Sequence, residues 1–153
     1  MEASKKAGRY SRMYKQLEGL METAEYPLSR MATIAAVLHH KMDYFFWTGF
    51  YLLVDGELMV HTYQGPVACM HLEKGTGVCW AGVERQESVL VPDVEQFPGH
   101  IACDSQSQSE IVVPVRDGKG EIVGVLDIDS SQKASFDEVD TQWLEKIVKL
   151  IYS

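Results

Sequence analysis

The chain has 153 residues, of which 46% are apolar and 24% are charged, so its composition fits one globular domain. Its formal net charge is −8, from 22 acidic and 14 basic residues, which disfavours binding to nucleic acid or to an anionic membrane surface. No apolar run approaches the ~20 residues that span a bilayer, and the N-terminus lacks the apolar stretch of a secretory signal. We therefore expect a cytoplasmic protein whose cysteines stay reduced unless they take part in a redox cycle.

Four helices are predicted from periodicity and from end signals. Apolar residues recur at helical spacing over residues 10–24, and Pro27 suits the first turn of a second helix over about 27–41. A short helix is expected over about 78–85, after the glycines that mark a turn. The last helix should start at Ser135, where Glu138 would complete a capping box.

Strands and hairpins fill the middle of the chain. Residues 45–54 are rich in aromatic and branched side chains, Asp55-Gly56 is a strong turn signal, and residues 58–64 return as the partner strand. Pro92 ends a short strand that starts at residue 89, and a second hairpin pairs residues 108–115 with 120–129. Because hairpins dominate, the order predicts an α+β fold, an antiparallel sheet with helices packed on it.

We expect a single domain over residues 1–153, with N-terminal helices over about 9–41, a sheet core over about 44–130 and a C-terminal helix over about 136–152. Residues 94–108 form a loop that is long for a compact domain, and such loops often carry function.

The three cysteines are Cys69, Cys79 and Cys103. An odd number argues against a closed disulfide framework. Cys103 lies in the polar loop, which is unusual for a structural cysteine. Cys79 begins the short helix, whose dipole would lower the pKa of the thiol, although a packing role fits the position equally well. A zinc site made from the cysteines with His71 or His100 is the alternative to thiol redox chemistry.

Acidic side chains recur on two neighbouring strands. Asp127 and Asp129 alternate with apolar residues, so both point to the same face, where repulsion should raise one pKa. Glu110 opens the adjacent strand and could converge with them. Such a group can bind an ammonium ion or deliver a proton, unless the face is simply solvated. The aromatic candidates for a pocket wall, which fit core positions as readily, are Trp47, Phe50 and Tyr51. The set fits a thiol redox enzyme or a ligand-binding module with incidental thiols.

Three stretches of sequence, GPVACMHLEKGTGVCWAG, VPDVEQFPGHIACD and SEIVVPV…GVLDIDS, resemble the free methionine-(R)-sulfoxide reductases, a family built on a single GAF domain. The resemblance runs from about Trp47 to the final helix. It implies a six-stranded antiparallel sheet with helices, in agreement with the hairpin pattern. It also implies reduction of free methionine-(R)-sulfoxide through a cysteine sulfenic acid and an intramolecular disulfide recycled by a thioredoxin-like reductant, without a cofactor or metal. A homodimer is a further expectation of the same kind.

The resemblance assigns roles position by position. Cys103, in GHIACD, matches the catalytic nucleophile, Cys69, in GPVAC, matches the resolving cysteine that bonds to it, and Cys79, in GVC, matches a third, auxiliary cysteine. The residues that match the acidic substrate site are Glu110, Asp127 and Asp129, and those that match the aromatic wall around the substrate's methyl group are Trp47 and Tyr51. A non-catalytic GAF module that binds a small ligand, or a cysteine-based redox sensor, is the alternative function.

Overall fold

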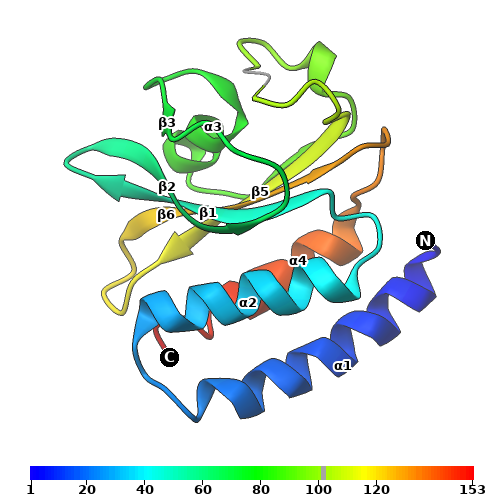
Figure 1. The fold of residues 1–153 in the computed structure, drawn as a ribbon, viewed down its shortest axis with the longest axis vertical. Helices are drawn as coiled ribbons and strands as arrows, with labels where there is room; N and C mark the ends of the chain where they lie inside the picture. Colours follow the sequence, from blue (N-terminus) through cyan, green and yellow to red (C-terminus); the bar gives the residue numbers. More distant parts are fainter. Residues whose placement is uncertain (101–102) are drawn as a thin grey trace.

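The computed structural model describes residues 1–100 and 103–153, in which a six-stranded sheet separates two layers (Figure 1). The strands are β1 (Trp47–Val54), β2 (Glu57–Gln64), β3 (His71–Leu72), β4 (Val89–Val91), β5 (Ser109–Arg116) and β6 (Ile122–Ser130). The helices are α1 (Ala3–Met21), α2 (Pro27–Lys41), α3 (Gly77–Arg85) and α4 (Glu138–Val148), with a 3-10 turn at Val94–Gln96. Residues 101–102, in the expected long loop, lie outside the described residues.

The strand order is β3-β2-β1-β6-β5-β4, and every neighbouring pair runs antiparallel. The predicted α+β fold is therefore confirmed. The turn at Asp55-Gly56 takes positive φ at both residues, 52° and 80°, as a tight hairpin between right-twisted strands requires. β3 was not predicted, because two residues are too few to show an alternating pattern.

Side chains of the central strands alternate between two apolar cores. In β6, Leu126 and Ile128 pack into the core formed with α1, α2 and α4, whereas Val125 packs into a second core with α3. Phe50 and Tyr51 divide β1 between the cores in the same way. Asp127 lies two residues after Val125 on β6, so its side chain points to the same face, the α3 side of the sheet.

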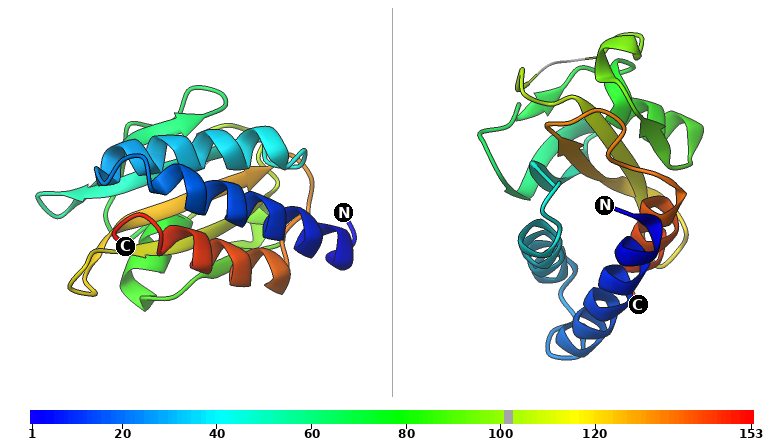
Figure 2. Two further views of the ribbon diagram at one scale, coloured as in Figure 1. Left: turned by 90° about the horizontal axis from the view of Figure 1, so that it is seen from below. Right: turned by 90° about the vertical axis from the view of Figure 1, so that its right-hand side faces the viewer.

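Three helices cover the opposite face. Figure 2 shows α2 and α4 lying against the sheet, with α1 packed over the space between them as an outer layer. The buried side of α1 is an apolar stripe at helical spacing, made of Tyr10, Met13, Leu17 and Met21. Within the described residues, no helix combines the length and the apolar character that a membrane crossing needs.

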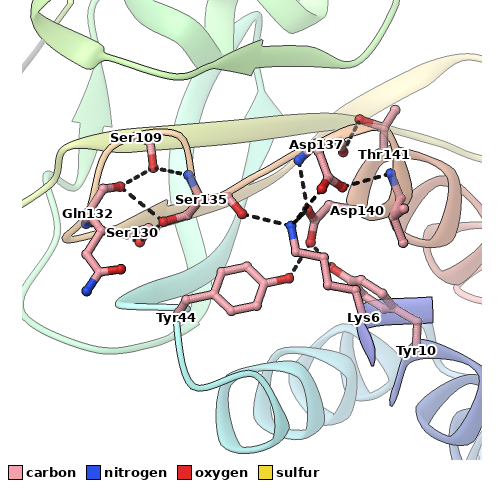
Figure 3. A network of polar contacts seen from close by, with 11 residues as sticks. Lys6, Tyr10, Tyr44, Ser109, Ser130, Gln132, Ser135, Asp137, Asp140 and Thr141 are labelled. Carbon is pink, nitrogen blue, oxygen red and sulfur yellow. Dashed lines mark hydrogen bonds and ion pairs between the residues drawn. The ribbon is translucent and has the colours of Figure 1, made fainter. Parts of the chain in front are cut away.

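A buried polar network joins the start of α1 to the start of α4 (Figure 3). Lys6 is only 2% exposed, and its Nζ donates to Asp140 Oδ2 at 2.6 Å and to the carbonyl of Ser135 at 2.9 Å. The hydroxyls of Tyr10 and Tyr44 both donate to Asp140 Oδ1. This anchor accounts for the helix beginning at Ala3, six residues before the predicted start near residue 9.

The predicted beginning of the last helix is wrong. α4 begins at Glu138, and its capping box uses Asp137 and Asp140 in place of Ser135 and Glu138. The Asp137 carboxylate accepts from the backbone of Val139 at 3.0 Å. Ser135 is not available as a cap, because its hydroxyl is hydrogen-bonded at 2.6 Å to the hydroxyl of Ser130, the last residue of β6.

Candidate active site

A cavity of about 60 Å³ lies on the α3 side of the sheet. Its walls come from β1, β5 and β6, the start of α3, Val67 and Ala68, and the loop residues His100, Cys103, Asp104 and Ser107. It collects seven of the eight side chains to which the family resemblance assigns roles, namely Trp47, Tyr51, Cys79, Cys103, Glu110, Asp127 and Asp129. The eighth, Cys69, is joined to the cavity through its bond to Cys103.

Cys69 and Cys103 form a disulfide, with their Cα atoms 5.5 Å apart. The pairing implied by the family resemblance is thereby confirmed. Cys103 is exposed and Cys69 half-buried, so the bond lies at the mouth of the cavity and not within a core. The alternative zinc site made from all three cysteines is not formed here, because two of the sulfur atoms are bonded to each other and Cys79 is separate and buried.

Two aromatic side chains of β1 hold the segment that carries Cys69. The Tyr51 hydroxyl donates to the carbonyl of Cys69 at 2.9 Å, and Trp47 Nε1 donates to the carbonyl of Pro66 at 3.1 Å. The two rings are stacked, with centroids 5.8 Å apart. Trp47 and Tyr51 therefore line the cavity and also fix the backbone beside the disulfide, a second role that the sequence pattern did not reveal.

Gly49 is a site residue that the sequence reasoning missed. It lies between the two aromatic residues on the same face of β1 and is paired with Asp127 of β6. A Cβ atom at this position would approach Tyr63 Cβ to 2.3 Å and the Trp47 ring to 2.7 Å. Only glycine therefore lets the Trp47 ring lie over the strand. The available signal was a glycine inside an aromatic strand, which often marks such a close approach.

The three carboxyls converge because of the strand register. Asp129 of β6 is paired with Trp47 on one side and with Glu110 on the other. Asp127 lies two residues before it, on the same face. Glu110 and Asp127 are each only 6% exposed, so the solvated alternative does not describe them. Burial is the largest cause that raises the pKa of all three carboxyls.

The carboxyls differ in how easily each one ionises. For Glu110 and Asp129, the negative charge of Asp127 raises the pKa further. For Asp127, interactions with Glu110 and Cys79 and with the imidazole of His100 oppose the effect of burial on the pKa. Asp127 is therefore the carboxyl that keeps its negative charge most readily, while its neighbours retain protons to higher pH.

Cys79 is a neutral thiol, contrary to the expectation from the helix dipole. Its side chain is buried, and burial together with Asp127 and Glu110 raises the pKa of the thiol well above its usual value. Desolvation and nearby negative charge thus outweigh the first turn of a helix that is only nine residues long. Cys79 therefore lacks the thiolate character of a nucleophile.

His100 also lines the cavity, with its Nε2 atom 3.9 Å from Glu110 Oε1. Burial lowers the pKa of its imidazole, and Asp127 partly opposes this shift. The ring is therefore largely neutral at pH 7 and offers either a hydrogen-bond donor or an acceptor to the cavity.

The geometry and three comparisons define the class of this protein. The family model described as the GAF domain matches residues 31–151. "GAF domain-containing protein A" of Dictyostelium discoideum is 44% identical over 147 residues, which cover 95% of this chain and 92% of that protein. The chain therefore belongs to the GAF-domain family.

Two relatives place it more closely within that family. The free methionine-R-sulfoxide reductase of Escherichia coli is 39% identical over 139 residues, 91% of this chain and 84% of that enzyme. The structure of the free methionine-R-sulfoxide reductase from Neisseria meningitidis in complex with its substrate superposes with a TM-score of 0.90 at 39% identity, covering 95% of this chain and 87% of that one. The chain belongs to the free methionine-R-sulfoxide reductases.

Proposed function

We propose that this protein reduces free methionine-R-sulfoxide to methionine, with Cys103 as the nucleophile and Cys69 as the resolving cysteine. The observation that carries the proposal is the Cys69–Cys103 disulfide at the mouth of a cavity lined by buried carboxyls. A disulfide between two surface segments is the expected oxidised product of a thiol reductase. The relatives with the same fold and close sequence are reductases of this substrate by name.

The cavity suits a free amino acid because it offers both signs of charge. Asp127, which keeps its negative charge most readily, would hold the ammonium group, with Asp129 and Glu110 beside it. Gly77 and Val78, at the start of α3, also line the cavity, and the positive end of the helix dipole at this first turn would favour the substrate's carboxylate. Trp47 and Tyr51 would enclose the apolar methyl end of the substrate.

In the first chemical step, the Cys103 thiolate attacks the sulfur of the sulfoxide. The sulfoxide's S–O bond breaks, an S–O bond forms on Cys103, and methionine leaves with its sulfur reduced by two electrons. The oxygen must gain a proton in this step. Glu110 and Asp129 can supply it, because burial and the charge of Asp127 raise the pKa of each, so that each keeps its proton to higher pH than an ordinary carboxyl does.

In the second step, the Cys69 thiol attacks the sulfenic acid of Cys103 and releases water, which forms the observed disulfide. A protein dithiol of the thioredoxin type then reduces the disulfide by two exchange reactions and becomes oxidised itself. Each turn therefore consumes one sulfoxide and one dithiol and yields methionine, water and one disulfide on the reductant.

The test is methionine formation from the free sulfoxide with dithiothreitol as reductant. We expect turnover with the R epimer at sulfur and little with the S epimer. A purified chain that binds the sulfoxide but forms no methionine would support the ligand-binding GAF module instead. Oxidation of the thiols without sulfoxide turnover would support the redox sensor.

A further inference from the structure

A buried cluster of metal-ligand type lies at the floor of the cavity. Cys79 Sγ, an oxygen of Glu110 and an oxygen of Asp127 all lie within 4.8 Å of one another. They come from α3, β5 and β6, three elements that the apolar core on this side of the sheet holds together. This donor set contains none of the disulfide sulfurs, so it differs from the zinc site considered from the sequence.

An unpaired atom in the cluster indicates that a ligand is missing. Asp127 is 6% exposed, and its Oδ1 has no hydrogen-bond partner within residues 1–100 and 103–153. A buried carboxylate oxygen without a partner is costly, so it normally marks the place of an unplaced cation, donor or water. The adjoining cavity of about 60 Å³ exceeds the ~10–15 Å³ that one water molecule needs.

We propose that Cys79 Sγ, one oxygen of Glu110 and one oxygen of Asp127 bind a divalent cation of the Zn²⁺ type, and that the bound metal excludes the ammonium group of the substrate. One thiolate with two carboxylates is a donor set for a borderline-soft ion, since hard ions such as Mg²⁺ prefer oxygen alone. His100, with its Nε2 atom 3.9 Å from Glu110 Oε1, lies outside this group of three and would have to move toward it to supply a fourth ligand.

The distances require only a small contraction of the site. Tetrahedral zinc, with Zn–O of about 2.0 Å and Zn–S of about 2.3 Å, needs ligand atoms roughly 3.3–3.8 Å apart. The three ligand atoms are at most 4.8 Å apart in this structure. Side-chain rotations that shift these atoms by about an ångström would bring them to the separations that zinc needs. The Cys79 thiol and any protonated carboxyl lose their protons to solvent as the metal binds, so three anionic donors around the dication leave a net charge of about −1, the same as that of one ionised carboxyl in the metal-free site.

Metal binding is independent of the proposed reaction, whereas exclusion of the substrate rests on it. Asp127 and Glu110 cannot neutralise an ammonium group while both coordinate a dication. The metal would therefore act as an inhibitor that competes for the same carboxylates, and methionine sulfoxide would in turn protect the site from metal.

The first experiment titrates Co²⁺ into the 153-residue chain in its disulfide form, where Cys79 is the free cysteine. We expect one equivalent to bind with a thiolate-to-cobalt charge-transfer absorption in the near ultraviolet, and Zn²⁺ to displace it. Cys79→Ser should remove this absorption and weaken Zn²⁺ binding at least about tenfold. Asp127→Asn, which conserves the shape of the side chain, should weaken Zn²⁺ binding by a similar factor. Because this variant keeps the Cys79 thiolate, its charge-transfer absorption should still appear, but only at higher Co²⁺ concentrations.

The control variant is His71→Ala. His71 Nε2 lies 3.2 Å from Glu57 Oε1 on the surface, which makes this pair the alternative place for a cation to bind. We expect the variant to bind Co²⁺ as the parent does. Cobalt binding without the charge-transfer absorption, or binding lost in His71→Ala and retained in Cys79→Ser, would overturn the site.

The second experiment tests exclusion with Cys69→Ser/Cys103→Ser, which keeps Cys79 and cannot turn over the sulfoxide. Free methionine sulfoxide should raise the apparent Kd of Co²⁺ in proportion to its concentration. Glycine chelates cobalt through the same two groups, so an equal concentration of glycine corrects for chelation in solution. A sulfoxide that binds while the metal stays in place would overturn exclusion. A sulfoxide that does not bind at all would refute the proposed function and leave the metal site standing on its spectrum.

Discussion

At the scale of single residues, Cys103 is the thiol on which the proposed reaction depends. Cys103→Ser should abolish methionine formation even with excess dithiothreitol, because Cys79 is buried with a raised pKa and cannot replace the nucleophile. The measurement is the steady-state rate of methionine release, with the fold checked by circular dichroism. A well-folded variant that retains turnover would move the nucleophile to another cysteine.

Cys69→Ser should separate the two halves of the cycle. The first step needs only Cys103, so about one methionine per chain should form in a single-turnover experiment. Recycling by a thioredoxin-like protein should fail, because the Cys69–Cys103 disulfide on which it acts cannot form. A quenched-flow measurement of the methionine formed per chain tests the first step. The steady-state rate with the protein reductant tests recycling. Normal steady-state recycling of this variant would contradict the role of Cys69.

Glu110 should destabilise the fold as the pH rises. Its pKa is raised by burial and by Asp127, so between an unfolded value of about 4.3 and the folded value the native chain binds more protons than the unfolded chain. The free energy of unfolding then falls with rising pH, by up to about 1.4 kcal/mol per pH unit. Glu110→Gln lacks this loss, so its stability relative to the parent should increase as the pH rises above the unfolded value of about 4.3.

Urea unfolding of the parent and the variant at several pH values measures this trend. Glu121→Gln is the matched control, because Glu121 is an exposed carboxyl close to the start of β6 and should give no growing advantage. An advantage for Glu110→Gln that shrinks as the pH rises would refute the buried-carboxyl argument. The turnover of Glu110→Gln should fall, because the substitution that raises stability also removes a proton-bearing group from the cavity.

Residue patterns predicted the shared face of Asp127 and Asp129, because alternation along a strand is a local property. They did not predict the pKa of Cys79, since the dominant causes are burial and the charges of Asp127 and Glu110, which lie on strands distant in the sequence. The meeting of Cys69 with Cys103 likewise depends on tertiary contacts and was reached only through family resemblance.

At the scale of elements, sequence periodicity placed α2 at its observed ends but missed the start of α1. Pro27 marks a boundary by its own covalent structure, so the signal is local. The first turns of α1 are polar, and what fixes them is the contact of Lys6 with Asp140, 134 residues away. The true cap of α4 was missed for the same reason, since Asp140 serves that cap and the network together.

Lys6 should therefore contribute more to stability than its surface-like sequence context suggests. Lys6→Met removes the cation and leaves Asp140 buried, so it should cost about 3–5 kcal/mol of unfolding free energy. Lys5→Met changes an exposed neighbour in the same turn and should change stability by less than about 0.5 kcal/mol. Urea midpoints of the two variants make the comparison. Equal effects would mean that the network in Figure 3 contributes little.

At the scale of the whole molecule, the sheet and the two segments that close over it have separate tasks. Strands β5 and β6 place the carboxyls at fixed register, whereas residues 67–68 and 103–107 line the same cavity, and the Cys69–Cys103 disulfide joins these two segments. The cavity is therefore bounded by these two segments as well as by the sheet. We expect this arrangement to limit the length of chain that a sulfoxide can carry at its amino end.

We therefore expect strong preference for free methionine sulfoxide over its N-acetyl or peptide-bound forms. An amide in place of the ammonium group leaves the charge of Asp127 uncompensated and adds atoms to a cavity that these two segments bound. A site built around a polar partner can reject analogues that lack it by about 10⁴-fold. Glu110→Gln combined with Asp129→Asn should lower kcat/KM for the free substrate and narrow the gap to the N-acetyl form. The measurement is kcat/KM for the free and the N-acetyl substrate, in the parent and in the double variant. Comparable values in the parent would mean that the carboxyls do not recognise the ammonium group.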